Sequence, residues 1–359
     1  EGMGGDAENT IFINSGRTAK AGKGNQVGRR IQFDNALLST LKDEFKDDIE
    51  FITARVNKNV VASYKGEKNN YSLRAVNPDH QFIEKSELVS GRFINQRDLQ
   101  ESTKVIVIGR LVKEDLFKTE KVIGEYIDLN KIQYKVVGVY QDIGDDNEER
   151  IIYMPLTTAQ RIYGNNDFID QINLTYNLSM GLDNAIALGT NIESRIKKIF
   201  NVEPSDQRAV RLRNRATEAN SINQFNSVLT ILVLIIGLGT LIAGIVGISN
   251  IMIFIVKERT KEIGIRKALG ARPSSIQSII LIESVLITSI SGYVGLLLGI
   301  GILEAYGPSL DKYFITDPSV STNLVAMATL ALIISGFIAA YVPAKRASQI
   351  KPIIALRDE

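Results

Sequence analysis

A charged block between two membrane-length apolar runs constrains the fold of this chain more than any other sequence feature. The block covers 257–271, and the long apolar runs cover roughly Val228–Val256, Ile279–Leu303 and Leu324–Val342. A helix needs about 20 mostly apolar residues to cross the hydrocarbon core of a bilayer, and all three runs meet that length. We therefore predict three membrane-spanning helices, preceded by a water-soluble domain that ends near residue 218.

Lysine and arginine are distributed unevenly among the short connecting segments. Segment 257–272 carries six Lys/Arg and two acids, the tail 345–359 carries four and two, and the loop 304–322 carries one lysine and three acids. Because Lys/Arg-rich loops stay in the cytoplasm, the first two segments are predicted to be cytoplasmic, and the loop and the large domain extracytoplasmic. The chain starts without a signal sequence, so we expect a further span ahead of Glu1, four spans in total and both termini inside.

The composition argues against several classes of function. Cysteine is absent, which excludes a disulfide framework and thiolate chemistry but leaves the redox compartment open. The single histidine, His80, is expected to be a surface or packing residue, because a multi-histidine metal site cannot be built from one. The net charge is +2, and no basic patch interleaved with aromatic residues points to nucleic acid. We expect no catalytic residue, cofactor or metal in this chain.

Short β-rich runs alternate with helical patterns in the soluble domain. The predicted strands are Ile49–Val56, Ser72–Val76, Thr103–Ile108, Tyr126–Leu129, Tyr134–Tyr140 and Phe168–Tyr176. The predicted helices are Asn35–Phe45, Leu111–Phe117, Thr157–Tyr163 and Leu182–Ile199. This alternation predicts an α+β domain over residues 1–208, in two mixed α/β subdomains, joined to an all-α transmembrane domain.

The segment from Ala209 to Ser227 is polar and lacks proline and glycine, so we predict a helical stalk that continues into the first span. The 48 residues Ala209–Val256 would form a helix about 72 Å long, whereas the hydrocarbon core is about 30 Å thick, so the excess would project into water. The expected divisions after the stalk are transmembrane helices at 228–256, 274–303 and 323–344, a cytoplasmic segment at 257–273, an extracytoplasmic loop at 304–322 and a cytoplasmic tail at 345–359.

Two motifs resemble ligand sites but fit them poorly. The segment Gly16–Lys23 looks like a phosphate-binding P-loop, yet residue 21 is alanine and Gly24 replaces the required Ser/Thr, so a flexible, solvated loop is the better interpretation. The acidic run Gly144–Glu149 could offer oxygen ligands to Ca²⁺, but its spacing fits no EF-hand, and a solvated turn is favoured.

Small residues recur at every fourth position in the apolar runs. Such stripes let helices approach closely in lipid, and packing within one subunit is the simpler interpretation for each. The three stripes are Gly239, Ala243 and Gly247; Ser291, Gly295 and Gly299; and Ala331, Ser335 and Ala339. We predict that the first stripe is a helix-packing or dimer contact.

Glu283 is the ionisable residue well inside an apolar run, where a carboxylate is costly and a functional role is the default hypothesis. It lies about ten residues past Arg272, roughly 15 Å along a helix, so it could also reach the inner interface or pair with a cation of the loop. We favour a structural anchor over a proton or substrate site.

The charged block is itself predicted to be helical. Glu262 and Arg266 are spaced i, i+4, Gly270 is placed to end the helix, and Pro273 suits the first turn of the next span. An apolar edge is formed by Ile265, Ala268 and Leu269, and Gly264 could allow close approach of a docking partner. From physics alone, a docking element and a loop that lies on the lipid headgroups are equally consistent with this pattern.

The block Glu258–Ala271 resembles the signature of MacB/FtsX-type ABC transporter permeases. The tail 343–357, with Pro343, Arg346, Pro352 and Leu356 in register, resembles the ending of that family. The outer domain is similar to the MacB periplasmic domain at Ser90–Phe93, Val105–Gly109 and Val136–Val139. The resemblance covers essentially the whole chain, and the two cytoplasmic motifs are its most specific part.

The resemblance implies a homodimer of four-span subunits in the bacterial inner membrane, with membrane lipid around the spans. The implied partners are an ABC ATPase, which binds ATP and Mg²⁺, a periplasmic adaptor and an outer-membrane channel. MacB carries its ATPase domain fused at the N-terminus, and because no such domain is visible in this sequence we expect the ATPase on a separate polypeptide. The implied ATPase-coupling residues are Glu258, Arg259, Lys261, Glu262, Ile263, Gly264, Arg266, Lys267, Ala268, Leu269 and Gly270.

The implied function is mechanotransmission, in which ATPase closure is relayed along the stalk to export a substrate that is already outside the inner membrane. The alternatives are an FtsX-like regulator of cell-wall hydrolases and a lipoprotein-releasing permease.

Overall fold

The computed structural model describes residues 7–22, 26–118, 121–142, 146–310 and 320–351. The chain divides into two units, Glu1–Phe225 and Asn226–Glu359, and each is described by itself. Parts of the predicted extracytoplasmic loop, the acidic run and the tail, including Pro352 and Leu356, lie outside the described residues.

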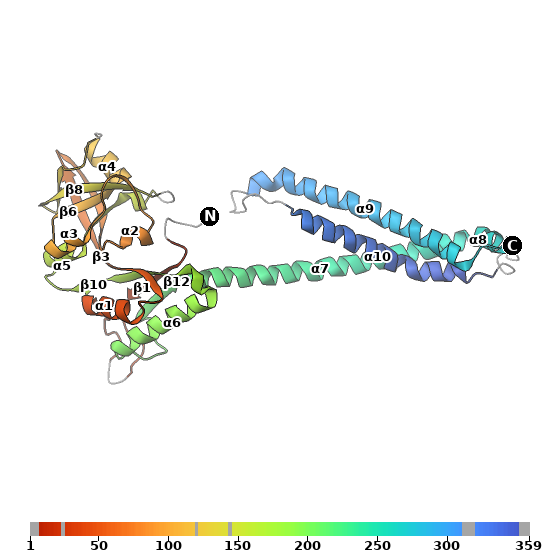
Figure 1. Cartoon of the computed structure of the whole chain (residues 1–359), viewed down its shortest axis with the longest axis horizontal. Helices are drawn as coiled ribbons and strands as arrows, with labels where there is room; N and C mark the ends of the chain where they lie inside the picture. Colours follow the sequence, from red (N-terminus) through yellow and green to blue (C-terminus); the bar gives the residue numbers. More distant parts are fainter. Residues whose placement is uncertain (1–6, 23–25, 119–120, 143–145, 311–319, 352–359) are drawn as a thin grey trace. The chain divides into compact units, whose positions relative to one another are not determined.

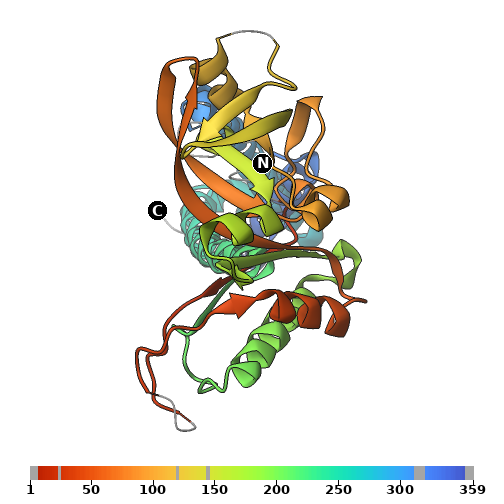
Figure 2. The ribbon, with the colours of Figure 1, turned by 90° about the vertical axis from the view of Figure 1, so that its left-hand side faces the viewer.

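The first unit is built on one ten-stranded sheet of order β12-β1-β11-β3-β4-β9-β6-β8-β5, in which β7 pairs with β3 and β8 (Figures 1 and 2). The strands are β1 (Thr10–Ser15), β3 (Ile49–Tyr64), β4 (Glu67–Val76), β5 (Glu87–Gly91), β6 (Val105–Gly109), β7 (Tyr126–Leu129), β8 (Ile132–Gln141), β9 (Ile151–Pro155), β11 (Gln171–Tyr176) and β12 (Val210–Asn214); β2 (Phe33–Asp34) and β10 (Phe168–Ile169) form a separate pair. Most neighbours are antiparallel, whereas β4–β9 and β6–β8 are parallel.

The helices of this unit cover the sheet and bury its apolar side chains. They are α1 (Asn35–Glu44), α2 (His80–Ile83), α3 (Gln96–Glu101), α4 (Arg110–Phe117), α5 (Leu156–Tyr163) and α6 (Leu182–Ile199), with two 3₁₀ turns at Glu148–Arg150 and Leu178–Met180. Helices α1 and α6 lie side by side (Figure 2), and Arg195 of α6 pairs with Glu44 of α1. The main core cluster includes Ile13, Leu41 and Leu73.

Strands β3 and β4 are longer than predicted because they form one long hairpin. Lys65 and Gly66 both adopt positive φ, 47° and 96°, which is the geometry of a two-residue hairpin turn. Side chains of Asn57, Lys58 and Asn59 are exposed, so hydrophobic alternation does not reveal this part of β3. The bounds of β7 and α6 agree with the prediction.

The prediction of a stalk helix from Ala209 is wrong at its start. Residues Val210–Asn214 form β12, an edge strand that pairs with β1, and helix α7 (Arg215–Glu258) begins only afterwards. The sequence Val-Arg-Leu-Arg-Asn alternates with the period of a strand, and Val210 and Asn214 are buried while Arg211 and Arg213 are exposed. The 44 residues of α7 correspond to about 66 Å of helix.

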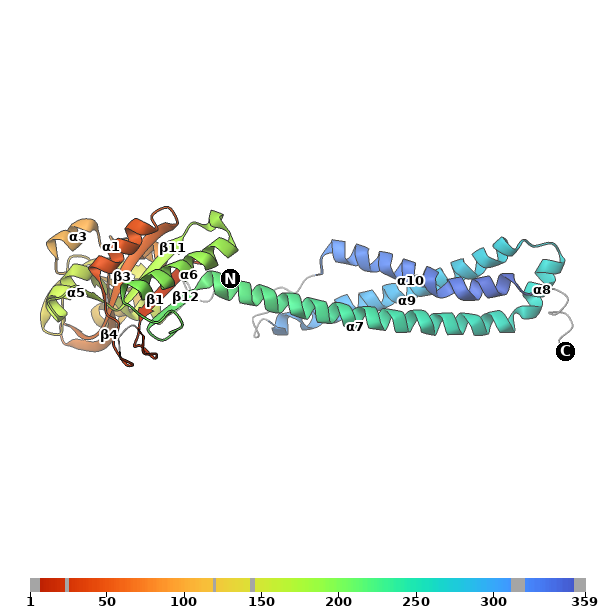
Figure 3. The ribbon, with the colours of Figure 1, turned by 90° about the horizontal axis from the view of Figure 1, so that it is seen from below.

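The second unit contains most of α7, then α8 (Thr260–Ala268), α9 (Pro273–Leu310) and α10 (Thr322–Ser348). Helices α7, α9 and α10 are each long and apolar enough to cross a membrane. Helices α9 and α10 pack side by side (Figure 3). An added Cβ at Gly292 would lie 2.5 Å from the Leu332 side chain, so this glycine permits close packing.

Candidate functional site

Helix α8 and its two junctions form the most specific constellation in the second unit. Arg259 separates α8 from α7, and the Ile263 amide donates to the Arg259 carbonyl at 3.0 Å. At the other end Gly270 has φ of 95°, and the amides of Gly270 and Ala271 donate to the carbonyls of Lys267 and Arg266. This is the left-handed C-terminal stop that favours glycine. The helix, its end at Gly270 and the start of α9 at Pro273 were all predicted.

One face of α8 is anchored in a small apolar cluster. Ile263 is 8% exposed and packs in this cluster with residues from three other helices. The remaining buried members are Met252 and Val256 of α7, Ile276 and Ile280 of α9, and Ala344 and Ala347 of α10. Because α8 shares a core with each long helix, it is fixed to all three.

Two cationic side chains, one at each end of α8, form an ion pair or hydrogen bonds with the neighbouring helices. Arg259 Nη1 lies 3.3 Å from both carboxylate oxygens of Glu283 in α9. Lys267 Nζ donates to the carbonyls of Ser348 and Ile350 at 2.7 Å each, at the end of α10. Carbonyls at a helix C-terminus lack intrahelical partners and carry partial negative charge, so a lysine there is favourable. Glu283 therefore pairs with Arg259, a cation of the charged block, as the structural-anchor interpretation allows.

The opposite face of α8 is exposed and mixes apolar and charged groups. Ile265 is 49% exposed and Leu269 84% exposed, and Lys261, Glu262 and Arg266 lie beside them. The predicted apolar edge therefore points away from the chain's own core, and the packing face is the one that carries Ile263.

Two expectations for the block are wrong. Gly264 is buried within the chain, so it is not available for a docking partner. In the part of the chain that the structure describes, Glu262 and Arg266 form no ion pair, and the helix is held by its core contacts instead.

The remaining predicted residues of the block, Glu258 and Ala268, are exposed.

Of the three small-residue stripes, the first has Gly239, Ala243 and Gly247 exposed, with nothing within 4 Å of an added Cβ at either glycine. The other two are partly wrong, because Gly295 and Gly299 meet open space and Ala331 is exposed, whereas Ser335 and Ala339 are buried.

The first unit holds a buried polar network that sequence reasoning missed. Glu84 accepts from Arg55 Nη1 at 2.8 Å, from Arg74 Nη1 at 3.1 Å and from the Tyr153 hydroxyl at 2.7 Å. Burial alone would raise the pKa of Glu84, but the positive charges of His80, Arg74 and Arg55 hold it well below its usual range. These residues come from β3, β4, β9 and α2, so no local pattern links them.

The sequence motifs considered as ligand sites serve other roles. His80 is fully buried, with Nε2 2.9 Å from Glu84 Oε2, so it packs in the interior as a member of the Glu84 network, consistent with the predicted packing residue. In the acidic run, Glu148 pairs with Arg74 and Glu149 with Arg110. Among the described residues no group of three or more His, Asp or Glu is placed to hold a metal ion. The described residues between Gly16 and α1 include no helix.

An α/β domain, three membrane-length helices and an anchored, charged connecting helix define a polytopic membrane protein. The family described as MacB-like periplasmic core domain matches residues 2–188, and the FtsX-like permease C-terminal family matches residues 227–352. The chain belongs to the MacB/FtsX-type ABC transporter permeases. It is a membrane protein with a large extracytoplasmic domain, as the sequence predicted.

Individual relatives agree with this assignment. The chain is 28% identical to the macrolide export ATP-binding/permease protein MacB of Bdellovibrio bacteriovorus, over 98% of this chain and 53% of that protein. It is 28% identical to the uncharacterized ABC transporter permease YknZ of Bacillus subtilis, over 87% of this chain and 76% of that protein. The chain therefore spans about half the length of the MacB protein that it matches.

The fold of the outer domain is also found in a solved structure. The crystal structure of the periplasmic region of MacB from Actinobacillus actinomycetemcomitans matches 61% of this chain and 94% of that chain. The TM-score is 0.50 at 19% sequence identity, so the likeness concerns the fold alone.

Proposed function

We propose that this chain is the permease subunit of a MacB-like transporter that couples ATP hydrolysis in the cytoplasm to export of a substrate from the periplasm. The name of the Bdellovibrio relative joins ATP-binding and permease functions, which supports an ATPase as partner. ATP and Mg²⁺ would be bound by that ATPase, which we place on a separate polypeptide. The permease itself carries out no chemistry and transmits force.

The observation that carries the proposal is the anchored helix α8 with its exposed mixed face. Leu269 and Ile265 are large apolar side chains held in the open, flanked by the charges of Lys261, Glu262 and Arg266. Exposed apolar groups with a charged rim are typical of a protein-docking surface. We name this surface, made of these five residues, the α8 face, and we propose that it binds the ATPase.

The proposed relay runs from the α8 face into α7. Ile263, on the buried side of α8, shares a core with Met252 and Val256, which lie near the end of α7. A push on α8 would therefore displace α7. An uninterrupted helix of 44 residues has no proline at which to bend, so α7 is suited to carry the displacement to the domain at its other end.

A homodimer is the proposed assembly, with α7 as its seam. The stripe of Gly239, Ala243 and Gly247 offers a surface on which a second helix can approach closely, and this chain leaves it uncovered. We further propose four spans per subunit in the bacterial inner membrane, two subdomains in the outer domain, and an adaptor and an outer-membrane channel as further partners.

The test is ATPase stimulation in a reconstituted complex of the full chain and its ATPase. Leu269→Ser removes the most exposed apolar group of the α8 face without touching the core, and we expect stimulation to fall several-fold. The matched control is Leu178→Ser, since Leu178 is a leucine of the outer domain that is 68% exposed. Normal stimulation by Leu269→Ser would show that the α8 face does not bind the ATPase.

The Arg259–Glu283 ion pair gives a second, reciprocal test. Arg259→Glu places two carboxylates together and should reduce coupling, while Arg259→Glu combined with Glu283→Arg should restore part of it, because the pair is rebuilt in reverse. Equal defects in the single and double variants would contradict a role for this ion pair in fixing α8.

A further inference from the structure

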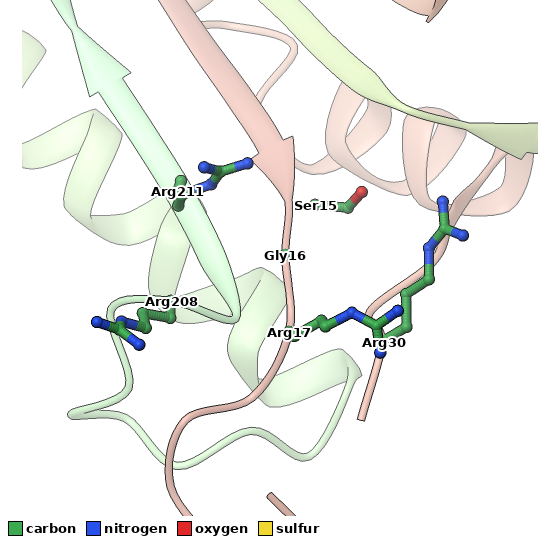
Figure 4. A pocket seen from close by; sticks show the side chains of 6 residues that line it. All are labelled: Ser15, Gly16, Arg17, Arg30, Arg208 and Arg211. Atoms are coloured by element: carbon green, nitrogen blue, oxygen red, sulfur yellow. The ribbon is translucent and has the colours of Figure 1, made fainter. Parts of the chain in front are cut away.

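Four arginines surround one open cavity at the edge of the outer-domain sheet (Figure 4). The cavity measures about 520 Å³ and is lined by Ser15, Gly16, Arg17, Arg30, Arg208 and Arg211. All four arginines are exposed. They come from three segments: Arg17 follows β1, Arg30 precedes Ile31, and Arg208 and Arg211 lie just before and within β12.

These four guanidinium groups have no acidic partner among the described residues, unlike most arginines of the domain. Arg55, Arg74, Arg92, Arg110 and Arg195, for example, each pair with a carboxylate. Four positive charges around one cavity create a positive potential, which attracts an anion.

The carboxylate of Asp206, next to the cavity, accepts its hydrogen bonds from backbone amides. Asp206 Oδ2 accepts from the amides of Ala19 and Lys20 at 2.7 and 3.0 Å, and Oδ1 accepts from the amides of Arg208 and Ala209 at 2.9 and 3.2 Å. Asp206 is buried, with 1% exposure. It therefore joins two arginine-bearing segments and does not neutralise their side chains.

The backbone around the cavity is closely fitted. An added Cβ at Gly16 would lie 2.0 Å from the Arg208 carbonyl oxygen, and the Gly16 amide donates to the Ala209 carbonyl at 2.9 Å. Arg17 and Arg30 lie opposite each other in an isolated β-bridge. In the described part of the segment that resembles a P-loop, 16–22, backbone contacts therefore hold Gly16 and Arg17, while the side chains of Arg17, Ala19 and Lys20 are exposed, in agreement with a solvated loop.

We propose that this cavity is a binding site for a small anion bearing two or more phosphate groups, a function beyond the coupling proposed above. Arginine forks match phosphate oxygens in paired hydrogen bonds, and 520 Å³ is within the usual range for small-molecule sites. Arg17 lies next to Gly16, Arg30 lies on a separate segment, and Arg208 and Arg211 lie across the β1 segment from them in Figure 4; this spread favours several linked phosphates over a single one.

Isothermal titration of the full chain in discs of zwitterionic lipid tests the proposal, with tripolyphosphate as the probe. We expect saturable binding of one ion per chain that weakens as NaCl is added. Arg30→Ala with Arg211→Ala should weaken binding at least tenfold, since each removes charge-assisted hydrogen bonds. The control is Arg161→Ala, because Arg161 is exposed on α5, away from the cavity.

Three results would overturn the proposal: no saturable binding, equal binding by the double variant, or tighter binding of a hexaglutamate peptide. Thermal unfolding of the double variant should match that of the parent chain, which excludes misfolding as the cause of lost binding. Discs that contain a lipid with a diphosphate headgroup identify the source, since a membrane ligand would compete with tripolyphosphate and a soluble one would not. The ATPase is absent from this assay, so failure of the coupling proposal would not affect it.

Discussion

Lys267→Met should release the segment Ser348–Ile350, at the end of α10, from α8 while leaving the fold intact. The ammonium group donates to the Ser348 and Ile350 carbonyls at 2.7 Å each, and methionine keeps most of the side-chain volume but neither hydrogen bond. Hydrogen bonds from charged groups contribute about 1.5–3 kcal/mol each. The two share one partly exposed ammonium, so we expect a loss of about 2–3 kcal/mol, or roughly 30- to 150-fold in the docking equilibrium.

Amide hydrogen exchange measures that loss directly. The amides of Gln349 and Ile350 donate to the carbonyls of Arg346 and Ala347 at the end of α10, so their exchange reports release of this segment. Exchange should accelerate by roughly the same 30- to 150-fold in Lys267→Met and stay unchanged in Lys351→Met, since Lys351 is exposed. Unchanged exchange in Lys267→Met would refute the inference that Lys267 holds Ser348–Ile350 against α8.

Three further predictions concern the cores of the two units. Glu84→Gln leaves Arg55 buried without a carboxylate and Arg74 with Glu148 alone, which should cost about 3–5 kcal/mol and lower the melting temperature by roughly 6–20 °C. The exposed Glu101→Gln should not; tyrosine fluorescence of the tryptophan-free chain measures the difference. The pKa of Glu84 in the folded chain is depressed below the ordinary 4.5, so its ionised carboxylate stabilises the fold fully above pH 4.5. That stabilisation is lost as the pH falls through the folded-state pKa. Since glutamine cannot titrate, the stability of the Glu84→Gln variant should fall less steeply in acid than that of the parent chain. Gly292→Ala should destabilise the α9–α10 packing, since its Cβ would lie 2.5 Å from the Leu332 side chain, and Leu332→Ala should rescue it in a double-mutant cycle of unfolding.

The membrane half of the fold could be predicted because its pattern is local. A long apolar run predicts a spanning helix, and a glycine at position 270 predicts a helix end, each from a few neighbouring residues. The observed α8, its C-terminal stop and the start of α9 all agree with these predictions. The face of α8 that packs could not be predicted this way. Ile263 and Ile265 are chemically alike, and only the neighbouring helices decide that Ile263 is buried and Ile265 exposed.

The outer domain was predicted less completely because its structure depends on contacts between distant parts of the chain. Strand β12 was mistaken for helix because a five-residue polar strand at a sheet edge is stabilised by pairing with β1, which lies about 200 residues earlier in the chain. The Glu84 network and the arginine cavity were missed for a related reason. Each gathers side chains from distant segments, and a single sequence gives no sign that Arg17 and Arg211 line one cavity.

Relay of force through α8 is tested most directly by a distance measured in the outer domain. Leu178→Cys would be the single cysteine of the chain, so a spin label there reports the separation of the two copies in the reconstituted complex with its ATPase. We predict that ATP binding changes this separation and that Leu269→Ser, in the same background, suppresses the change. An ATP-dependent change of equal size in the Leu269→Ser complex would contradict the relay.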